Sequence, residues 1–126
     1  MKKHFQKIVG ALAVVTLVLG ACGSAEPDRN LSEVAELGRE VALSRGCSAC
    51  HGENGEGGVG PAWVGLAGST VALEGGGAVV ADAEYLRRSM VDPQADIVEG
   101  VTITMPGNDL SEPEITALIA YIEELK

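Results

Sequence analysis

The stretch GCSACHGENG, residues 46–55, places Cys47, Cys50 and His51 within five positions of one another. On a helical turn, positions i, i+3 and i+4 share a face, so these three side chains can address one ligand together. Three kinds of site fit such a cluster. They are a redox-active dithiol, a structural zinc ion, and an iron porphyrin joined to the chain by two thioethers.

The first 22 residues differ in composition from the rest of the chain. Three lysines precede a mostly apolar run at 8–19. This run is shorter than the roughly 20 apolar residues that cross a membrane, and its charged start is typical of a secretory signal. It ends in Leu19-Gly20-Ala21-Cys22, which resembles the lipobox of bacterial lipoproteins. We therefore expect a lipoprotein signal peptide at 1–21 and a tether at 22–29, lipidated on Cys22; an uncleaved anchor with an unmodified cysteine is the alternative.

Removal of the signal peptide changes the charge and the set of possible ligands. The chain has 9 basic and 18 acidic residues, and loss of three lysines leaves 6 against 18, a formal net charge of −12. Such a surface excludes electrostatic binding of nucleic acid; it suits a partner with a basic docking patch, or simply keeps an exported protein soluble. With Cys22 lipidated, Cys47 and Cys50 are the only thiols left, and loss of His4 makes His51 the only histidine.

These counts separate the three kinds of site. A thioredoxin-like dithiol lies beside a sheet in a βαβ arrangement, and no such pattern is present. A structural zinc ion needs four ligands, and beyond the cluster only carboxylates remain. Covalent haem needs two thiols three positions apart and an adjacent histidine. The sequence therefore favours one haem c, with Cys47 and Cys50 as thioether tethers and His51 as an iron ligand.

The second axial ligand of such an iron has two candidates, Met90 and Met105. Met90 lies on the apolar face of an expected helix, where a core role is the simpler interpretation. Met105 precedes Pro106 in an irregular segment that can present its sulfur to iron. We predict Met105, with Met90 or an open site as alternatives. His/Met ligation raises the reduction potential and closes the iron to substrates, which indicates outer-sphere electron transfer rather than catalysis.

The expected first helix begins at a capping-box pattern formed by Asn30 and Glu33 and ends near Arg45. Its apolar residues at helical spacing are Val34, Leu37 and Val41. Gly38 interrupts this helix, and a glycine there either permits the close approach of another helix or is merely tolerated.

The remaining expected elements complete one small domain at 30–126. Apolar runs at 70–73 and 78–80 flank a glycine turn and predict a β-hairpin. Asp82 is expected to cap a helix that ends near Val91. A second capping box, formed by Ser111 and Glu114, is expected to begin the last helix, whose apolar stripe contains Ile115, Leu118, Ile119 and Ile122.

The order of these features resembles a class I cytochrome c. They are CxxCHG, a glycine-rich loop with Gly60-Pro61, a middle helix, Met105-Pro106 and a last helix with Tyr121. The resemblance is closer to the cytochrome c domain fused to subunit II of some bacterial cytochrome c oxidases. The shared stretches are GLAGSTVAL (65–73), YLRRSMVDPQADIVEG (85–100) and LSEPEITALIAYIEELK (110–126). It implies an all-α, cytochrome c-like fold around a covalently bound haem, with a small β-hairpin insertion, in a free-standing relative.

The resemblance also implies roles for single residues. The Pro61 carbonyl would accept a hydrogen bond from the second ring nitrogen of His51 and orient the imidazole. Trp63 would lie along the haem or fill the core. Gly38 and Tyr121 would meet where the first and last helices cross.

The chain departs from its relatives around Met105. Relatives often carry a tyrosine where Val101 stands, and an aromatic residue shortly after Met-Pro where this chain has Gly107-Asn108-Asp109. These differences affect the shielding of the haem on the Met105 side, and therefore its potential.

The resemblance implies a carrier of single electrons between respiratory membrane complexes, which either moves between a quinol-oxidising complex and a terminal oxidase or is a subunit beside one of them. Lipid on Cys22 would hold it at the outer face of the cytoplasmic membrane. The alternative is a haem sensor or peroxidase-like enzyme whose Met105 leaves the iron easily. A peroxidase also needs a distal acid/base group, and the chain has no second histidine beyond the signal.

Overall fold

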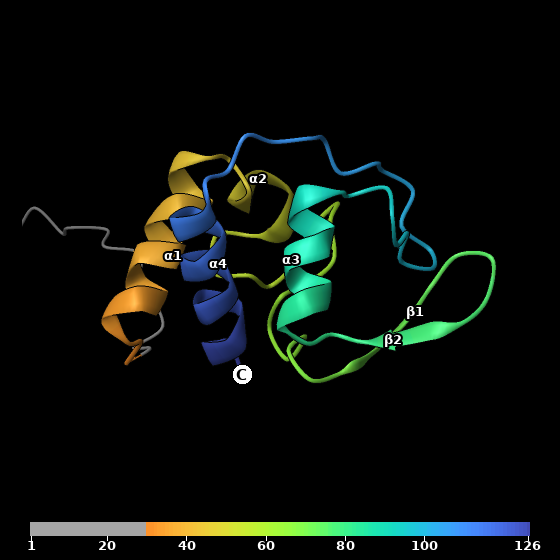
Figure 1. The fold of residues 1–126 in the computed structure, drawn as a ribbon, viewed down its shortest axis with the longest axis horizontal. Coiled ribbons are helices and arrows are strands. Elements are labelled where there is room, and N and C mark those ends of the chain that lie inside the picture. Colours follow the sequence, from red (N-terminus) through yellow and green to blue (C-terminus); the bar gives the residue numbers. More distant parts are fainter. Residues whose placement is uncertain (1–29) are drawn as a thin grey trace, which may run out of the picture.

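The computed structural model describes residues 30–126 (Figure 1). The predicted signal peptide, the tether and Cys22 lie outside these residues. Within them, no helix is long and apolar enough to cross a membrane. The elements are, in chain order, α1 (Glu33–Ser44), α2 (Ser48–His51), β1 (Thr70–Ala72), β2 (Ala78–Val80), α3 (Ala83–Val91) and α4 (Glu112–Glu124). The described part is therefore mainly helical with one small hairpin, as predicted.

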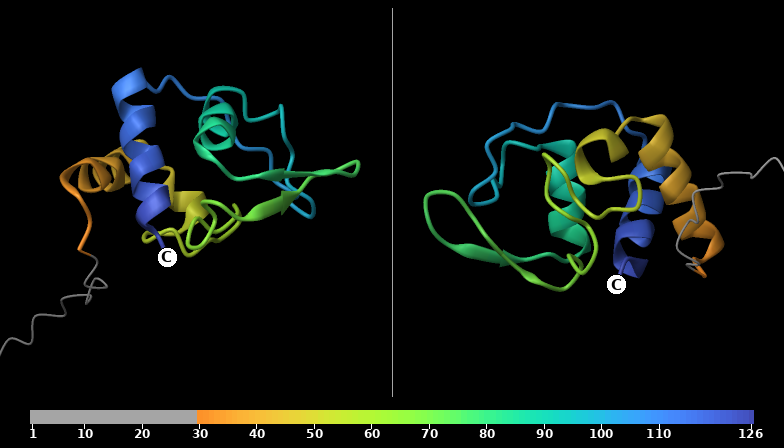
Figure 2. Two further views of the ribbon diagram at one scale, coloured as in Figure 1. Left: turned by 60° about the horizontal axis from the view of Figure 1, so that its bottom comes forward. Right: turned by 180° about the vertical axis from the view of Figure 1, so that it is seen from behind.

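Helices α1 and α4 cross in close contact (Figures 1 and 2). The residues that α1 buries are small: Ala35, Gly38 and Ala42. A Cβ atom added at Gly38 would overlap the carbonyl of Ala117 and lie 2.7 Å from the Cβ of Tyr121. Only glycine permits this approach of the two backbones, which confirms the expected contact between Gly38 and Tyr121.

The larger apolar residues of α1 do not form its packing face. Val34 and Leu37 are 47% and 55% exposed, and Val41 is half-buried. The helix was correctly predicted from their spacing, but the face buried against α4 is the adjacent small-residue stripe. The reason is geometric, since two helices come this close only where their side chains are small.

The start of α1 corrects the predicted capping box at Asn30. The N-cap is Ser32, whose Oγ accepts a hydrogen bond from the Ala35 amide at 3.3 Å. The reciprocal carboxylate comes from α4 instead of Glu33. Glu124 accepts from the Ser32 amide at 2.9 Å and from its hydroxyl at 2.6 Å. The cap is thus completed by a residue 92 positions away, which a local pattern does not reveal.

The other predicted boundaries are confirmed. The Asp82 carboxylate accepts from the Tyr85 amide at 2.9 Å and begins α3. Ser111 donates its amide to Glu114 at 2.8 Å in the capping box of α4. Strands β1 and β2 pair antiparallel, with Val71 opposite Val79.

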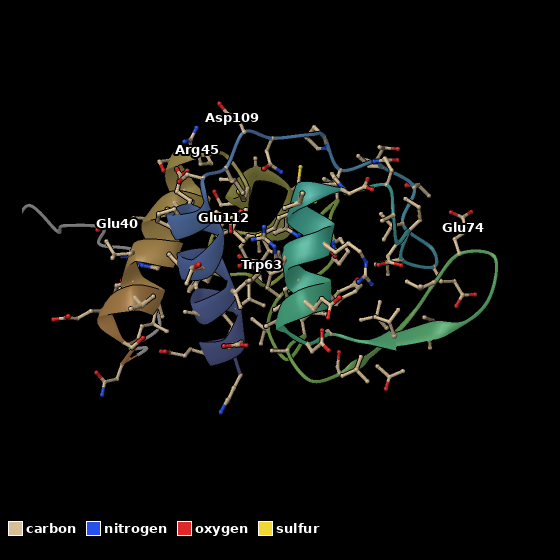
Figure 3. All side chains as sticks on the ribbon, in the orientation of Figure 1. Glu40, Arg45, Trp63, Glu74, Asp109 and Glu112 are labelled. Atoms are coloured by element: carbon tan, nitrogen blue, oxygen red, sulfur yellow. The ribbon has the colours of Figure 1, made fainter. Side chains whose placement is uncertain are left out.

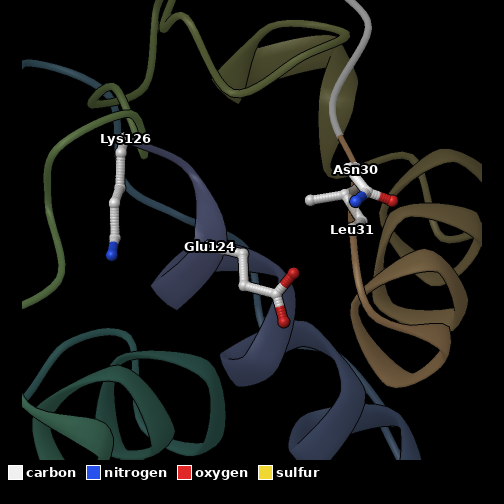
Figure 4. Close-up of a pocket in the computed structure, with 4 residues that line it drawn as sticks. All are labelled: Asn30, Leu31, Glu124 and Lys126. Carbon is white, nitrogen blue, oxygen red and sulfur yellow. The ribbon is translucent and has the colours of Figure 1, made fainter.

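The core is formed by residues of α1, α3 and α4 and includes Trp63 from the loop before β1, which lies between α4 and α3 in Figure 3. Met90 on α3 is 7% exposed and belongs to this core, as predicted. A separate shallow depression of about 270 Å³ lies beside the end of α4 (Figure 4), and none of the predicted site residues lines it. Its lining residues are Asn30, Leu31, Glu124 and Lys126.

Candidate functional site

The two cysteines and the histidine of the motif lie on one helical turn. Cys47 is the N-cap of α2, and its carbonyl accepts from the amides of Cys50 at 3.2 Å and His51 at 3.0 Å. Both thiols are free and half-buried. Burial raises the pKa of the Cys47 thiol, and its backbone hydrogen bond and Arg45 partly oppose this. The turn therefore brings two free thiols and one imidazole together.

The His51 ring is oriented by the loop that follows it. Its Nδ1 lies 2.8 Å from the Pro61 carbonyl oxygen, which is the predicted hydrogen bond. Burial lowers the pKa of His51, and the bond to Pro61 opposes this only in part. A neutral imidazole that donates its Nδ1 proton to Pro61 keeps the lone pair of Nε2 free for a metal.

Trp63 supports the other side of the same imidazole. The two ring centroids are 4.5 Å apart with an angle of 19° between the planes. Trp63 is 7% exposed and meets Tyr121 edge-on, at 6.3 Å and 86°. The tryptophan is thus a core residue, one of its two expected roles, and it also fixes the His51 ring. That second role was not predicted, and the only signal for it was the position of the chain's single tryptophan just after Gly60-Pro61.

The glycines after the motif let the chain fold back onto it. The Gly57 amide donates to the His51 carbonyl at 2.7 Å, and the Gly60 amide donates to the Cys50 carbonyl at 2.9 Å. A Cβ at Gly58 would lie 2.9 Å from the Cys50 carbonyl oxygen, and one at Gly60 would lie 3.1 Å from Cε1 of His51. The glycine-rich composition of this loop follows from these close approaches.

Arg45, two residues before Cys47, ties the motif to the segment that carries Met105. Its guanidinium lies 2.7 Å from Glu114. It also lies 3.3 Å from Asp109, and both of these residues are labelled in Figure 3. These two carboxylates belong to the start of α4 and to the segment before it. The ion pairs therefore join the histidine side of the domain to the methionine side.

Met105 lies in the non-helical segment between α3 and α4, and it is half-buried. Its carbonyl accepts from Nε2 of Gln94 at 3.3 Å. Three residues later, Nδ2 of Asn108 donates to the Met90 carbonyl at 2.8 Å, and Oδ1 of Asn108 accepts from the Leu110 amide at 3.3 Å. Asn108 thus joins the segment to the end of α3. The ligation of iron by Met105 stays a prediction.

The donor set suits haem better than zinc. Among residues 30–126, no three His, Cys, Asp or Glu side chains converge on a possible metal position, which leaves the zinc alternative without a ligand set there. Two free thiols and an imidazole with one nitrogen already engaged are the groups that covalent haem requires.

Taken together, the helical fold and this site define a haem-carrying electron-transfer protein. The sequence model of the cytochrome c family matches residues 35–126, and the chain belongs to this family. Its cofactor is accordingly one covalently bound haem c. No curated protein matches the sequence.

Proposed function

We propose that the protein is a lipid-anchored monohaem carrier that passes single electrons between respiratory membrane complexes, towards a terminal oxidase. The observation that carries this proposal is the His51 imidazole, held between Pro61 and Trp63 beside two free thiols. The haem supplies one-electron chemistry at its iron. The chain attaches it through Cys47 and Cys50 and orients its axial ligand.

Met105 is proposed as the second axial ligand. The competing residue, Met90, is packed in the core, and its carbonyl is engaged by Asn108. Met105 lies on a segment without helical or strand structure, and so its side chain is not committed to an element of the fold. A Met ligand closes the iron to small molecules, which favours a carrier over the sensor or peroxidase alternative.

The acidic surface favours a partner with a basic docking patch. Each of the four arginines among residues 30–126 lies beside a carboxylate, so their charges are largely compensated locally. The pairs are Arg39–Glu36, Arg45–Glu114, Arg87–Glu112 and Arg88–Asp96. The remaining acidic groups give the surface a negative field that speeds encounter with a positively charged partner.

The absorption spectrum of the purified holoprotein tests the proposed iron ligation. The ferric protein should show the Met–iron charge-transfer band, and carbon monoxide should leave the ferrous spectrum unchanged. Met105→Ala should lose the band and bind carbon monoxide, whereas the volume-conserving control Met90→Leu should behave as wild type. Fast binding of carbon monoxide by the wild type would instead support the sensor or peroxidase alternative.

Membrane fractionation tests the anchor. Cys22→Ser should release the protein from membranes when the signal peptide is cleaved by the general export route. Retention of processed Cys22→Ser protein in the membrane would contradict the lipid anchor.

Acid–acetone treatment tests the covalent attachment of the haem. It should leave the haem on the chain, because thioethers survive it. Extraction of all colour would contradict covalent attachment.

A further inference from the structure

The open edge of the β-hairpin is occupied by the segment that follows α3. Leu73 forms an antiparallel bridge with Val98. On one side of this bridge the Glu74 amide donates to the Ile97 carbonyl at 2.8 Å, and on the other the Glu99 amide donates to the Ala72 carbonyl at 2.9 Å. The hairpin is therefore joined to residues 97–99 by one isolated antiparallel bridge and its two flanking hydrogen bonds.

This pairing is fixed to the rest of the domain on both sides. Leu73 and Val98 are half-buried and pack against the core. Just before the pairing, Asp96 lies 2.6 Å from the guanidinium of Arg88 on α3. In Figures 1 and 2 the chain leaves α3, reaches the hairpin and then returns to the start of α4.

Beyond this pairing the backbone has little support. The Val101 amide donates to the Val98 carbonyl at 3.2 Å, but the segment 102–110 makes no backbone–backbone hydrogen bond with any residue of 30–126. The side chains of Gln94 and Asn108 hold it instead. Met105 lies in this segment, six residues after Glu99.

We propose that the β-hairpin is the positioning element of the Met105 segment. Residues 72–74, at the end of β1 and just after it, fix residues 97–99, and this shortens the free chain that ends at Met105. A shorter chain between fixed points has fewer conformations in which the sulfur lies away from the iron. The hairpin thus acts on the iron through Met105 without contacting it, and the proposal rests on the ligation by Met105 proposed above.

Glu74 and Glu99 allow a test that removes the pairing amides alone, since proline is compatible with both positions. Glu74 and Glu99 are each the second residue of a turn, closed by Gly76 N–H to Leu73 O and by Val101 N–H to Val98 O. The third residue of each turn is a glycine with positive φ, 85° at Gly75 and 78° at Gly100. Turns of this type favour proline in the second position. Proline there removes only the amide that pairs the hairpin with 97–99.

The experiment compares Glu74→Pro/Glu99→Pro with Glu74→Ala/Glu99→Ala in the ferric holoprotein. The alanine variant loses the same carboxylates and keeps both amides. Binding of imidazole to the iron, which requires departure of Met105, should be about tenfold faster in the proline variant than in the alanine variant. Ser32→Ala, which weakens the distant cap of α1, should lower the thermal midpoint without changing the imidazole rate. It separates the positioning role from general destabilisation.

A second measurement uses the wild type, in case the proline variant does not take up haem. The Glu74 and Glu99 amides should exchange their hydrogens at least ten times more slowly than the amides of residues 102–104, because a closed pairing protects its donors. Two results would overturn the role of the hairpin and leave the ligation by Met105 intact, provided that the wild type shows the Met–iron band. One is equal hydrogen exchange of the two sets of amides. The other is an imidazole rate in the proline variant within twofold of that in the alanine variant. A wild type without that band would overturn the ligation by Met105 and this proposal together.

Discussion

The region around His51 and the region around Met105 are held by different means. His51 is enclosed by residues that follow it closely in sequence: Gly60, Pro61 and Trp63. Met105 is held by residues that are distant in sequence or that act through side chains. They are Gln94, Asn108 and, through the ion pair with Asp109, Arg45.

This difference shows which side of the site can adjust. The region around His51 is held by backbone hydrogen bonds, by aromatic stacking and by close packing, so small changes there are expected to disturb the fold. The methionine side depends on a few exposed or half-exposed polar contacts, so changes there are expected to alter the motion of the segment more than the stability of the domain. Four predictions test this contrast.

The largest effect is expected from Trp63→Ala. The substitution removes a buried aromatic side chain that stacks on His51 and meets Tyr121, and it should lower the free energy of unfolding by about 4 kcal/mol. Urea unfolding of the holoprotein measures this. A loss below about 1 kcal/mol would mean that the histidine side is no more tightly packed than the rest.

The same substitution can be compared on the two sides with Gly60→Ala and Gly107→Ala. A Cβ at Gly60 would lie 3.1 Å from Cε1 of His51 and 3.2 Å from the Cys50 carbonyl oxygen, whereas one at Gly107 would meet nothing within 4 Å. We expect Gly60→Ala to destabilise the domain by about 1.5 kcal/mol, and Gly107→Ala to change it by less than about 0.5 kcal/mol. Equal effects in thermal unfolding would remove the contrast.

A smaller and more local effect is expected from Asn108→Ala. It removes the hydrogen bonds to the Met90 carbonyl and from the Leu110 amide, each with a net contribution of about 1 kcal/mol. Hydrogen exchange should become faster in residues 102–110 and stay unchanged in α1. Asn108→Asp keeps the acceptor for Leu110 and loses the donor to Met90, so it should have an intermediate effect. Unchanged exchange in Asn108→Ala would show that this side chain does not hold the segment.

The smallest effect is expected from Glu114, which pairs with Arg45 across the two sides and also caps α4 through Ser111. Hydrogen bonds from the Ser111 amide and hydroxyl, together with Arg45, lower the pKa of Glu114 to about 2. An unfolded glutamate titrates at about 4.3, so this carboxylate stabilises the fold fully above that pH. The contribution is lost as the pH falls towards 2.

Urea unfolding at a series of pH values between about 5 and about 2 measures this loss, because this range spans the pKa values of Glu114 in the unfolded and folded states. Glu114→Gln should flatten the decline relative to the wild type. Glu123→Gln, an exposed glutamate on the same helix, is the matched control and should leave the decline unchanged. A decline that is identical in wild type and Glu114→Gln would show that other carboxylates cause it.

Much of the fold could be predicted because its signals are local. The hairpin, the caps at Asp82 and Ser111 and the turn that carries Cys47 all depend on residues within a few positions of one another. The predicted capping box at the start of α1 was wrong because the carboxylate that completes the cap belongs to α4. The packing face of α1 was also not evident, since α4 decides which face of a helix is buried.

The candidate site divides in the same way. By itself, the sequence determined the haem motif and the family, because CxxCH, Gly-Pro and Met-Pro are short contiguous patterns, and the resemblance that these patterns carry implied the hydrogen bond from His51 to Pro61. Only the tertiary structure decided that Trp63 stacks on His51, that the small-residue face of α1 is the one buried, and that Leu73 pairs with Val98 in the segment leading to Met105. Each of these contacts joins residues from separate elements, and contacts of that kind are set by how the elements pack.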